Sequence, residues 1–291
     1  MDVRAFVTGL AFALIWSSAF TSARVIVIYA PPLWALSVRF LVSGLIACGI
    51  AVALGQSMRL TAAQWRAVVL FGICQNALYL GLNFIALQRI EASVAAIIAS
   101  TMPLLVALAG WVIFHEKLRR MAIAGLFAGV VGVALIMGLR INSGGDVIGT
   151  VMCGLAVVSL TVATLAMRGV STGNNLLMIV GLQMLVGAAV LVGPALALEP
   201  FEVTWTWQLV VAFAYSTLVS GVLATYIWFV LVRRLGAVKA ATYHFLNPFF
   251  GVAVAAALLG ERLGIFDFLG VAIIAGGILA VQWSKQLPTP M

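Results

Sequence analysis

The sequence predicts an all-α integral membrane protein with ten transmembrane helices, arranged as two inverted five-helix repeats. Composition, the spacing of apolar stretches and an internal repeat support this prediction. With 64% hydrophobic and 8% charged residues and a mean hydropathy of +1.20, the chain lacks the polar side chains that would cover a soluble domain. Apolar stretches of about 20 residues, the length that spans a bilayer as a helix, follow one another with no long polar segment between them.

A long repeat occupies much of the chain. At an offset of 145 residues, without gaps, Pro103 superimposes on Pro248 and Glu116 on Glu261. Further matched pairs are Phe84 and Phe229, Arg89 and Arg234, Ala95-Ala96 and Ala240-Ala241, Leu118 and Leu263, Gly125 and Gly270, and Gly132 and Gly277. We expect one five-helix repeat at 1–141 and a second at 142–291. Because five crossings are an odd number, the second repeat enters the membrane inverted, an architecture typical of transporters.

Residues that end helices separate the expected spans. Pro31-Pro32 and Pro200 cannot continue a helix, the segment 56–64 is polar, and 142–146 and 171–175 are polar turns with glycine. The first stretch is too long for the apolar part of a signal peptide and lacks a clear cleavage site, so we expect it to be a span. The ten expected spans are 5–29, 33–54, 64–88, 92–114, 119–139, 147–167, 175–198, 206–232, 237–259 and 264–283.

The basic residues predict that both termini are cytoplasmic, because cytoplasmic loops retain Lys and Arg. With the N-terminus inside, the outer set is Arg24, Arg39, Arg89, Arg140 and Arg262. The inner set is larger: Arg4, Arg59, Arg66, Lys117, Arg119, Arg120, Arg168, Arg233, Arg234, Lys239 and Lys285. Arg24 and Arg39 are expected nearer the outer ends of their spans, where long side chains reach the interface.

Polar side chains at the middle of a span usually face a cavity or another helix. Asn76, Tyr79 and Asn83 are spaced three and four apart and share one helix face, as do Tyr243 and Asn247. An aromatic ring beside an amide suits a substrate with a polar group and an apolar part; hydrogen bonds between helices are the alternative. The predicted substrate-binding residues are Trp16, Ser17, Asn76, Tyr79, Asn83, Ser100, Tyr243, His244 and Asn247.

Equivalent prolines interrupt the fourth and ninth spans. Pro103 and Pro248 each remove a backbone hydrogen bond, which serves either a gating kink or a static bend. Glu116 and Glu261 stand at the equivalent helix ends, as interfacial anchors or gate contacts.

Among side chains that titrate near neutral pH, only His244 falls within a span, so protein-borne proton coupling would pass through it. An interhelical hydrogen bond is the alternative role for this residue.

Several function classes find no support in the sequence. The net charge of +8 is scattered between apolar runs, which argues against a nucleic-acid partner. All eight carboxylates lie at span ends or in loops, which argues against recognition of a cation by an intramembrane carboxylate. Cys48, Cys74 and Cys153 show no metal-ligand spacing, and no intramembrane-protease, hydrolase or Walker motif occurs. We therefore expect no enzyme, no catalytic or metal-binding residues and no cofactor.

The chain resembles the EamA-like ten-helix exporters of the drug/metabolite transporter superfamily. Trp16-Ser-Ser-Ala-Phe20 is similar to the Trp-Gly-x-x-Phe start of that family, with Ser17 in place of its glycine. The segments 103–118 and 248–263 look like its paired Pro…Glu-Lys/Arg-Leu signatures. The closest resemblance is to bacterial inner-membrane exporters of aromatic amino acids and methionine, and the family implies alternating access.

The expected function is export of neutral amino acids, aromatic, methionine or threonine-like, and related metabolites across a bacterial inner membrane. The expected partners are the lipid bilayer and this small-molecule substrate, with the chain acting as a monomer. A multidrug or other small-metabolite exporter is the alternative within transport. A polytopic sensor subunit is the alternative from another class, although it would need no inverted repeat.

Overall fold

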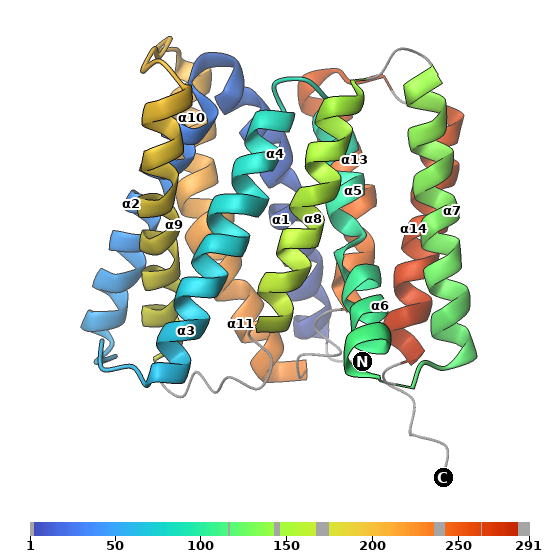
Figure 1. The fold of residues 1–291 in the computed structure, drawn as a ribbon, viewed down its shortest axis with the longest axis horizontal. Coiled ribbons are helices and arrows are strands. Elements are labelled where there is room, and N and C mark those ends of the chain that lie inside the picture. Colours follow the sequence, from blue (N-terminus) through green and yellow to red (C-terminus); the bar gives the residue numbers. More distant parts are fainter. Residues whose placement is uncertain are drawn as a thin grey trace. The chain divides into compact units, whose positions relative to one another are not determined.

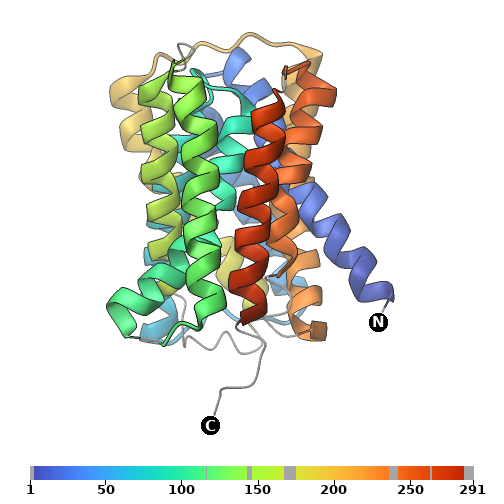
Figure 2. The ribbon, with the colours of Figure 1, turned by 90° about the vertical axis from the view of Figure 1, so that its right-hand side faces the viewer.

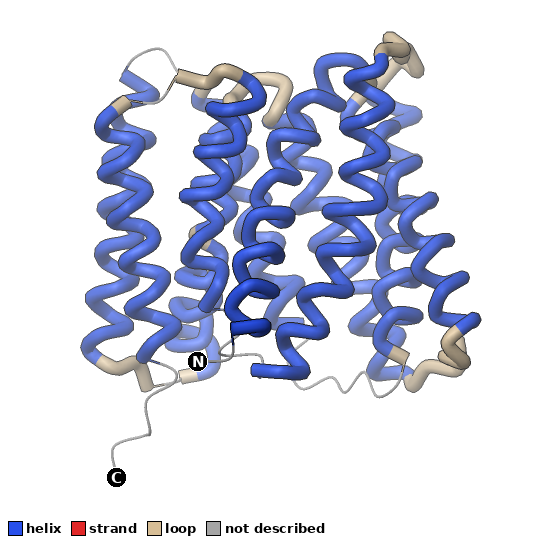
Figure 3. Tube along the Cα trace, turned by 180° about the vertical axis from the view of Figure 1, so that it is seen from behind, coloured by secondary structure: helices blue, strands red, loops and turns tan. Residues whose placement is uncertain are grey.

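The computed structural model describes residues 3–115, 117–142, 146–166, 175–235, 242–262 and 264–284, and every regular element within them is a helix (Figures 1 and 3). Of the residues named above, Glu116, Arg168, Lys239, Ala240, Ala241, Leu263 and Lys285 lie outside these ranges, with most of the turns at 142–146 and 171–175.

The helices follow one another with short connections. In chain order they are α1 (Val3–Tyr29), α2 (Pro32–Ala53), α3 (Ala62–Phe71), η1 (Gly72–Tyr79), α4 (Leu80–Ala86), α5 (Ala92–Ser100), α6 (Met102–Phe114), α7 (Arg120–Asn142), α8 (Val147–Ala166), α9 (Leu176–Leu198), α10 (Trp207–Ala214), η2 (Tyr215–Leu223), α11 (Ala224–Leu235), η3 (Thr242–Leu246), α13 (Asn247–Leu259) and α14 (Ile265–Ser284). Here η1 and η2 are π-helices that continue their neighbours, and η3 is a 3₁₀-helix.

In the described part of the chain, eight helical segments are long and apolar enough to cross a bilayer. Two shorter apolar helices, 120–136 and 243–259, fall in the expected fifth and ninth spans. This arrangement fits a chain that crosses the membrane several times, and the count of ten spans stays a prediction.

The chain forms two compact units that do not follow the expected repeat boundary. Unit 1 comprises residues 1–21, 90–150 and 223–291, and unit 2 comprises residues 22–89 and 151–222. Each unit therefore takes helices from both sides of residue 141. The two repeats at 1–141 and 142–291 stay a prediction about the sequence.

Glycines bring helix backbones close together in unit 1. Helices α7 and α14 run side by side (Figures 1 and 2). A methyl group on Gly125 would lie 2.6 Å from the Gly277 carbonyl oxygen, and one on Gly132 would lie 3.0 Å from that of Gly270. Helices in membranes often associate through small residues, which let their backbones pack closely. The hydrophobic effect contributes little there, because the lipid tails are as apolar as the helix surfaces.

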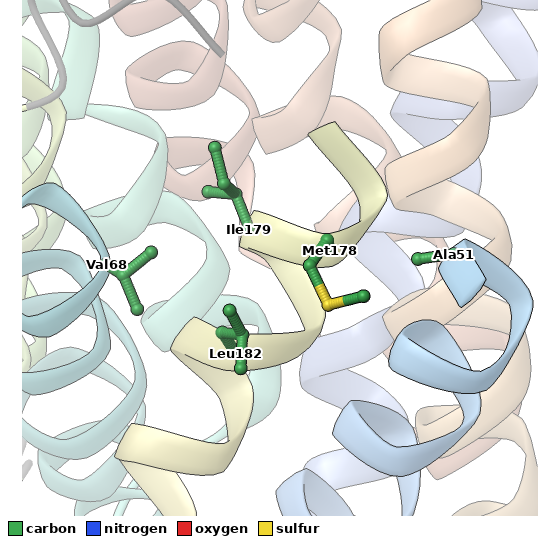
Figure 4. Packing of buried hydrophobic residues seen from close by; sticks show 5 residues of the cluster. All are labelled: Ala51, Val68, Met178, Ile179 and Leu182. Atoms are coloured by element: carbon green, nitrogen blue, oxygen red, sulfur yellow. The ribbon is translucent and has the colours of Figure 1, made fainter. Parts of the chain in front are cut away.

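In unit 2 the equivalent contact joins α2 and α9. A methyl group on Gly44 would lie 3.0 Å from the Gly181 carbonyl oxygen. A cluster of buried apolar side chains joins α2, α3 and α9 next to this contact (Figure 4): Ala51, Val68, Met178, Ile179 and Leu182.

Two carboxylates close the N-termini of helices far away in the sequence. Glu199 accepts hydrogen bonds from the backbone N–H groups of Leu33 (2.9 Å) and Trp34 (3.2 Å) at the start of α2. Glu261 accepts from the N–H groups of Ala92 (2.8 Å) and Ser93 (3.0 Å) at the start of α5. The first N–H groups of a helix lack acceptors within the helix and carry partial positive charge. A carboxylate at this end accepts their hydrogen bonds and compensates the charge.

Three backbone irregularities occur twice, at the offset of the sequence repeat or within two residues of it. The π-helix η1 covers 72–79 and η2 covers 215–223. The residue before each proline-bearing helix has nearly the same conformation: Thr101 has φ −76° and ψ −8°, and Leu246 has φ −82° and ψ −17°. The third pair is the left-handed C-cap of α6 at His115 (φ 54°) and that of α13 at Gly260 (φ 68°).

His115 is the one non-glycine residue with positive φ in the part of the chain that the structure describes. In the left-handed region, a residue with a side chain is roughly 1–2 kcal/mol less stable than glycine. Replacement by glycine regains only part of this energy, because the more flexible glycine backbone loses more entropy on folding. Replacing His115 by Gly is therefore expected to stabilise the protein by up to about 1 kcal/mol. Thermal unfolding of the purified protein in detergent should show a higher midpoint. Gly260→Ala, the matched change at the equivalent cap, should lower it, and a lower midpoint for His115→Gly would contradict the prediction.

Candidate functional site

Three aromatic side chains of unit 1 pack against the imidazole of His244, and we call these four residues the aromatic cluster. The ring centroid of Phe12 lies 5.5 Å from that of His244, edge to face, and that of Trp16 lies 6.3 Å away in the same manner. Trp228 packs at 5.3 Å in a tilted arrangement. These separations are those of favourable aromatic pairs.

The chain builds the aromatic cluster from three helical segments. Phe12 and Trp16 are four residues apart on α1 and so share a face, while Trp228 comes from α11. His244 stands in η3, the 3₁₀ turn before Pro248 interrupts the ladder of backbone hydrogen bonds. Phe12 also contacts Trp16 (5.6 Å) and Trp228 (5.0 Å) directly.

A hydrogen bond at 2.9 Å joins the amide Nδ2 of Asn247 to Nδ1 of His244. With the amide as donor, Nδ1 accepts, and the neutral ring then carries its proton on Nε2. The two residues are three apart across the junction of η3 and α13. His244 therefore offers an N–H donor at Nε2 while the aromatic rings enclose the ring itself.

Four buried polar atoms of unit 1 lack a hydrogen-bond partner among the described residues: Oδ1 of Asn247, Oγ of Ser17, Oγ1 of Thr21 and Oγ of Ser93. Asn247 and Ser17 are the two that are next to members of the aromatic cluster, in hydrogen-bond contact with His244 and adjacent in sequence to Trp16. Asn247 is 8% exposed and Ser17 is 1% exposed. Ser17 lies near α13, since a methyl group on Gly251, one turn beyond Asn247, would be 4.0 Å from its Cβ. Buried polar groups usually have a hydrogen-bond partner. Binding of a ligand or water molecule that forms a hydrogen bond with these atoms is therefore favourable.

The structure gives the other predicted site residues of unit 1 local roles. The hydroxyl of Ser100 donates to the carbonyl of Ile97 (2.6 Å) at the end of α5. The ring of Tyr243 lies where a side chain on Gly9 would be. Pro103 and Pro248 both stand at the second position of their helices and are buried, and whether the breaks gate or only bend stays a prediction.

The predicted residues of unit 2, Asn76, Tyr79 and Asn83, are all at least 97% buried. The amide of Asn76 donates to the Gln183 carbonyl on α9 at 2.8 Å. The amide of Asn83 donates to the Tyr79 carbonyl (2.8 Å), and its Oδ1 accepts from the Cys153 thiol (3.3 Å). The hydrogen bonds that join Asn76 to Gln183 and Asn83 to Cys153 link different helices and correspond to the interhelical alternative. A role of these residues in substrate binding stays a prediction.

Sequence reasoning did not single out Phe12, although its spacing of four from Trp16 was a signal. The expectation for Arg39 was wrong. Instead of reaching the outer interface, its side chain is 7% exposed, and its Nε donates to the Ser216 carbonyl at 3.0 Å. A one-dimensional count of residues from a span end does not reveal an acceptor inside the bundle.

A model of the EamA-like transporter family matches residues 3–138 and 147–283. The chain belongs to the EamA-like transporter family. This membership confirms the resemblance drawn from Trp16 to Phe20 and from the two proline segments. An EamA-like transporter whose described ranges alone contain eight long apolar helical segments is a multi-pass membrane protein.

Relatives of this EamA-like chain are also named as transporters. It is 26% identical to the uncharacterized transporter YvbV of Bacillus subtilis, over 95% of this chain and 91% of YvbV. It is 24% identical to the uncharacterized inner membrane transporter YedA of Escherichia coli K12, over 96% of this chain and 91% of YedA. A shorter match, 29% identical over 41% of this chain and 36% of the relative, is to the S-adenosylmethionine/S-adenosylhomocysteine transporter of Chlamydia trachomatis.

One crystal structure of another protein superimposes on this EamA-like chain with a TM-score of 0.69. The sequences are 22% identical, and the match covers 99% of this chain and 100% of the other. At this identity the similarity concerns the fold. Within the described ranges, no three His, Cys, Asp or Glu side chains come together as a metal site would require.

The hydrogen bond from Asn247 predicts the tautomer of His244. In the His115→Gly variant, His244 is the one histidine left, and its ¹⁵N signals at neutral pH should report a proton on Nε2. An Asn247→Leu variant removes the donor and should bring both tautomers into the spectrum. A proton on Nδ1 in the variant that keeps Asn247 would contradict the assignment.

Proposed function

We propose that this protein exports neutral amino acids, aromatic, methionine or threonine-like, and related metabolites by alternating access across a bacterial inner membrane. The observation that carries the proposal is the aromatic cluster with the unpartnered oxygens of Ser17 and Asn247 beside it. Membership of a transporter family supports the class of function, and YedA, named as an inner membrane protein, supports the location.

The chemistry of the aromatic cluster suits an amino acid with an apolar side chain. The rings of Phe12, Trp16 and Trp228 can pack against an aromatic side chain or a thioether. An ammonium group can donate to Oδ1 of Asn247 and lie over an aromatic face. Oδ1 of Asn247 and Nε2 of His244 thus supply one acceptor and one donor, as the polar end of such a substrate requires.

The repeat supports ten spans in two inverted halves. Sequence identities and three backbone irregularities recur at an offset near 145 residues, and irregularities of this kind arise independently only rarely at matching positions. Five spans in each half place the second half upside down. Both termini are then cytoplasmic, as the distribution of Lys and Arg also indicates.

A second candidate is a carrier of S-adenosyl compounds, favoured by the relative from Chlamydia trachomatis. An adenine ring and a sulfonium would also suit aromatic surroundings. The transport assay below separates this candidate, and a multidrug exporter, from the amino-acid exporter. The sensor alternative gains no support from the family.

Topology can be tested with cysteines at two exposed positions of unit 2. Ser57 follows the second expected span and Thr204 the seventh. In a variant without the three native cysteines, Ser57→Cys should react only with reagent on the cytoplasmic side and Thr204→Cys only with reagent outside. Labelling of both from one side would exclude the inverted ten-span arrangement.

Transport can be tested in proteoliposomes without ATP or an ion gradient, loaded with unlabelled amino acids. Protein-dependent uptake of labelled phenylalanine, methionine or threonine is expected. Trp16→Ala should reduce it roughly tenfold, because an aromatic contact of about 1.4 kcal/mol is lost. Trp111→Ala, which removes an exposed tryptophan of α6, should keep uptake within about twofold of the unchanged protein.

The outcomes of this assay separate the candidates. Uptake of S-adenosylmethionine or of a cationic dye, with none of any amino acid, would replace the proposed substrate class. Equal losses in Trp16→Ala and Trp111→Ala would remove the aromatic cluster from the site. The same assay with Tyr79→Phe and Asn76→Ala tests the predicted residues of unit 2.

A further inference from the structure

Three large aromatic side chains are exposed in the connection between α9 and α10, at one end of α9 (Figure 1). Phe201 is 67% exposed, Trp205 is 78% exposed, and Trp207, the first residue of α10, is 72% exposed. We call these three residues the edge aromatics. Exposed apolar groups of this size usually mark a contact with a membrane or a partner.

The connection stands at the edge of the bilayer. It follows the 23-residue apolar segment Leu176–Leu198, and the next apolar segment begins at Trp207. A helix of this length is about 35 Å long, more than the hydrocarbon core of about 30 Å. The edge aromatics therefore lie where the hydrocarbon meets the lipid headgroups.

Contacts within unit 2 hold the connection in place. The N–H of Thr204 donates to the Tyr29 carbonyl at 2.8 Å, which ties the connection to the end of α1. The ring of Phe201 meets that of Trp34 edge to face, with centroids 5.4 Å apart. Glu199, at the start of the connection, caps α2. The edge aromatics are thus presented by a backbone with fixed contacts on α1 and α2.

The equivalent connection of the sequence repeat has the same helix cap without the rings. Thr61 and Thr206 are 145 residues apart, and each hydroxyl accepts the N–H of the third residue of the helix that follows, at 3.3 Å and 3.2 Å. The positions that correspond to the edge aromatics hold Gln56, Leu60 and Ala62. The turn into the helix therefore does not require exposed aromatic residues.

The side chains of the connection suit the headgroup layer. An indole ring has an apolar body and one N–H donor, and tryptophan is enriched where membrane and water meet. The segment 199–206 contains two glutamates and no Lys or Arg. Attraction to anionic lipids, which basic residues provide, is therefore absent here, and the rings themselves supply the attachment.

We propose that the edge aromatics insert into the lipid headgroup layer and fix the depth of unit 2 in the membrane at this end of α9 and α10. Their partner is the bilayer interface, and headgroup charge does not determine the contact. This anchoring concerns the membrane alone and does not depend on which substrate the protein carries.

The test measures the depth of the two tryptophans in the unchanged protein. The protein is labelled with 5-fluorotryptophan and placed in phosphatidylcholine nanodiscs, and the ¹⁹F signals of its eight tryptophans are recorded. The variants Trp205→Phe and Trp207→Phe serve only to assign two of these signals. Three paramagnetic agents are compared: a lipid with the spin label on its headgroup, a lipid with the label at the end of an acyl chain, and a water-soluble gadolinium chelate.

The headgroup label is expected to broaden the signals of Trp205 and Trp207 roughly threefold more than either other agent, because the rings lie at its depth. Discs of phosphatidylglycerol should give the same result. Trp16, the eleventh residue of the 24-residue segment Phe6–Tyr29, is the control from the middle of a span. Its signal, assigned with Trp16→Phe, should show no preference for the headgroup label.

Several results would overturn the proposal. Strongest broadening by the chelate would place the rings in water, and strongest broadening by the acyl-chain label would place them in hydrocarbon. Broadening by none of the agents would mean that protein, such as a second copy of the chain, covers the rings. Dependence on phosphatidylglycerol would show that charge provides the attachment. Phe201→Cys, carrying a fluorophore that spin-labelled lipids quench, gives a second measurement that needs no tryptophan variant.

Discussion

Every backbone polar group that lies in hydrocarbon must find its partner within the protein, because no water is there to supply one. Regular helices meet this requirement by themselves, and side chains meet it where the ladder is interrupted. The hydroxyls of Ser100 and Thr101 donate to the carbonyls at the end of α5. In the π-helices, Ser159 donates to the Cys74 carbonyl of η1, and Ser43 donates to the Thr217 carbonyl of η2.

The same interruptions concentrate the polar chemistry of the chain. The break before Pro248 places His244 and Asn247 together, with the imidazole against three aromatic rings and one amide oxygen unpaired. The wide turns of η2 present the Ser216 carbonyl to the buried guanidinium of Arg39. A transporter needs polar groups inside a bilayer that can exchange partners, and in this chain they occur where the helices depart from regular geometry.

Much of the fold could be predicted from the sequence, because hydropathy and helix-breaking residues depend on local composition alone. The all-helical class and the family follow from the apolar stretches, Trp16 to Phe20 and the two proline segments. Helix spacing also put Asn76, Tyr79 and Asn83 on one face. It could not show that the carbonyl of Gln183 on another helix takes the amide of Asn76, because such a contact depends on packing between distant segments. The expected position of the Arg39 side chain was wrong for the same reason, because its acceptor, the Ser216 carbonyl, lies on a distant segment.

The carboxylate caps bear on how the chain is made. Glu199 and Glu261 close the N-termini of α2 and α5, yet both are synthesised long after those helices. While only the first half has left the ribosome, two helix ends keep bare N–H groups at the edge of the membrane. The early spans therefore enter the bilayer with unfinished ends and acquire their final partners from the second half. This dependence ties completion of the first half to arrival of the second, so the first half alone is not a finished folding unit.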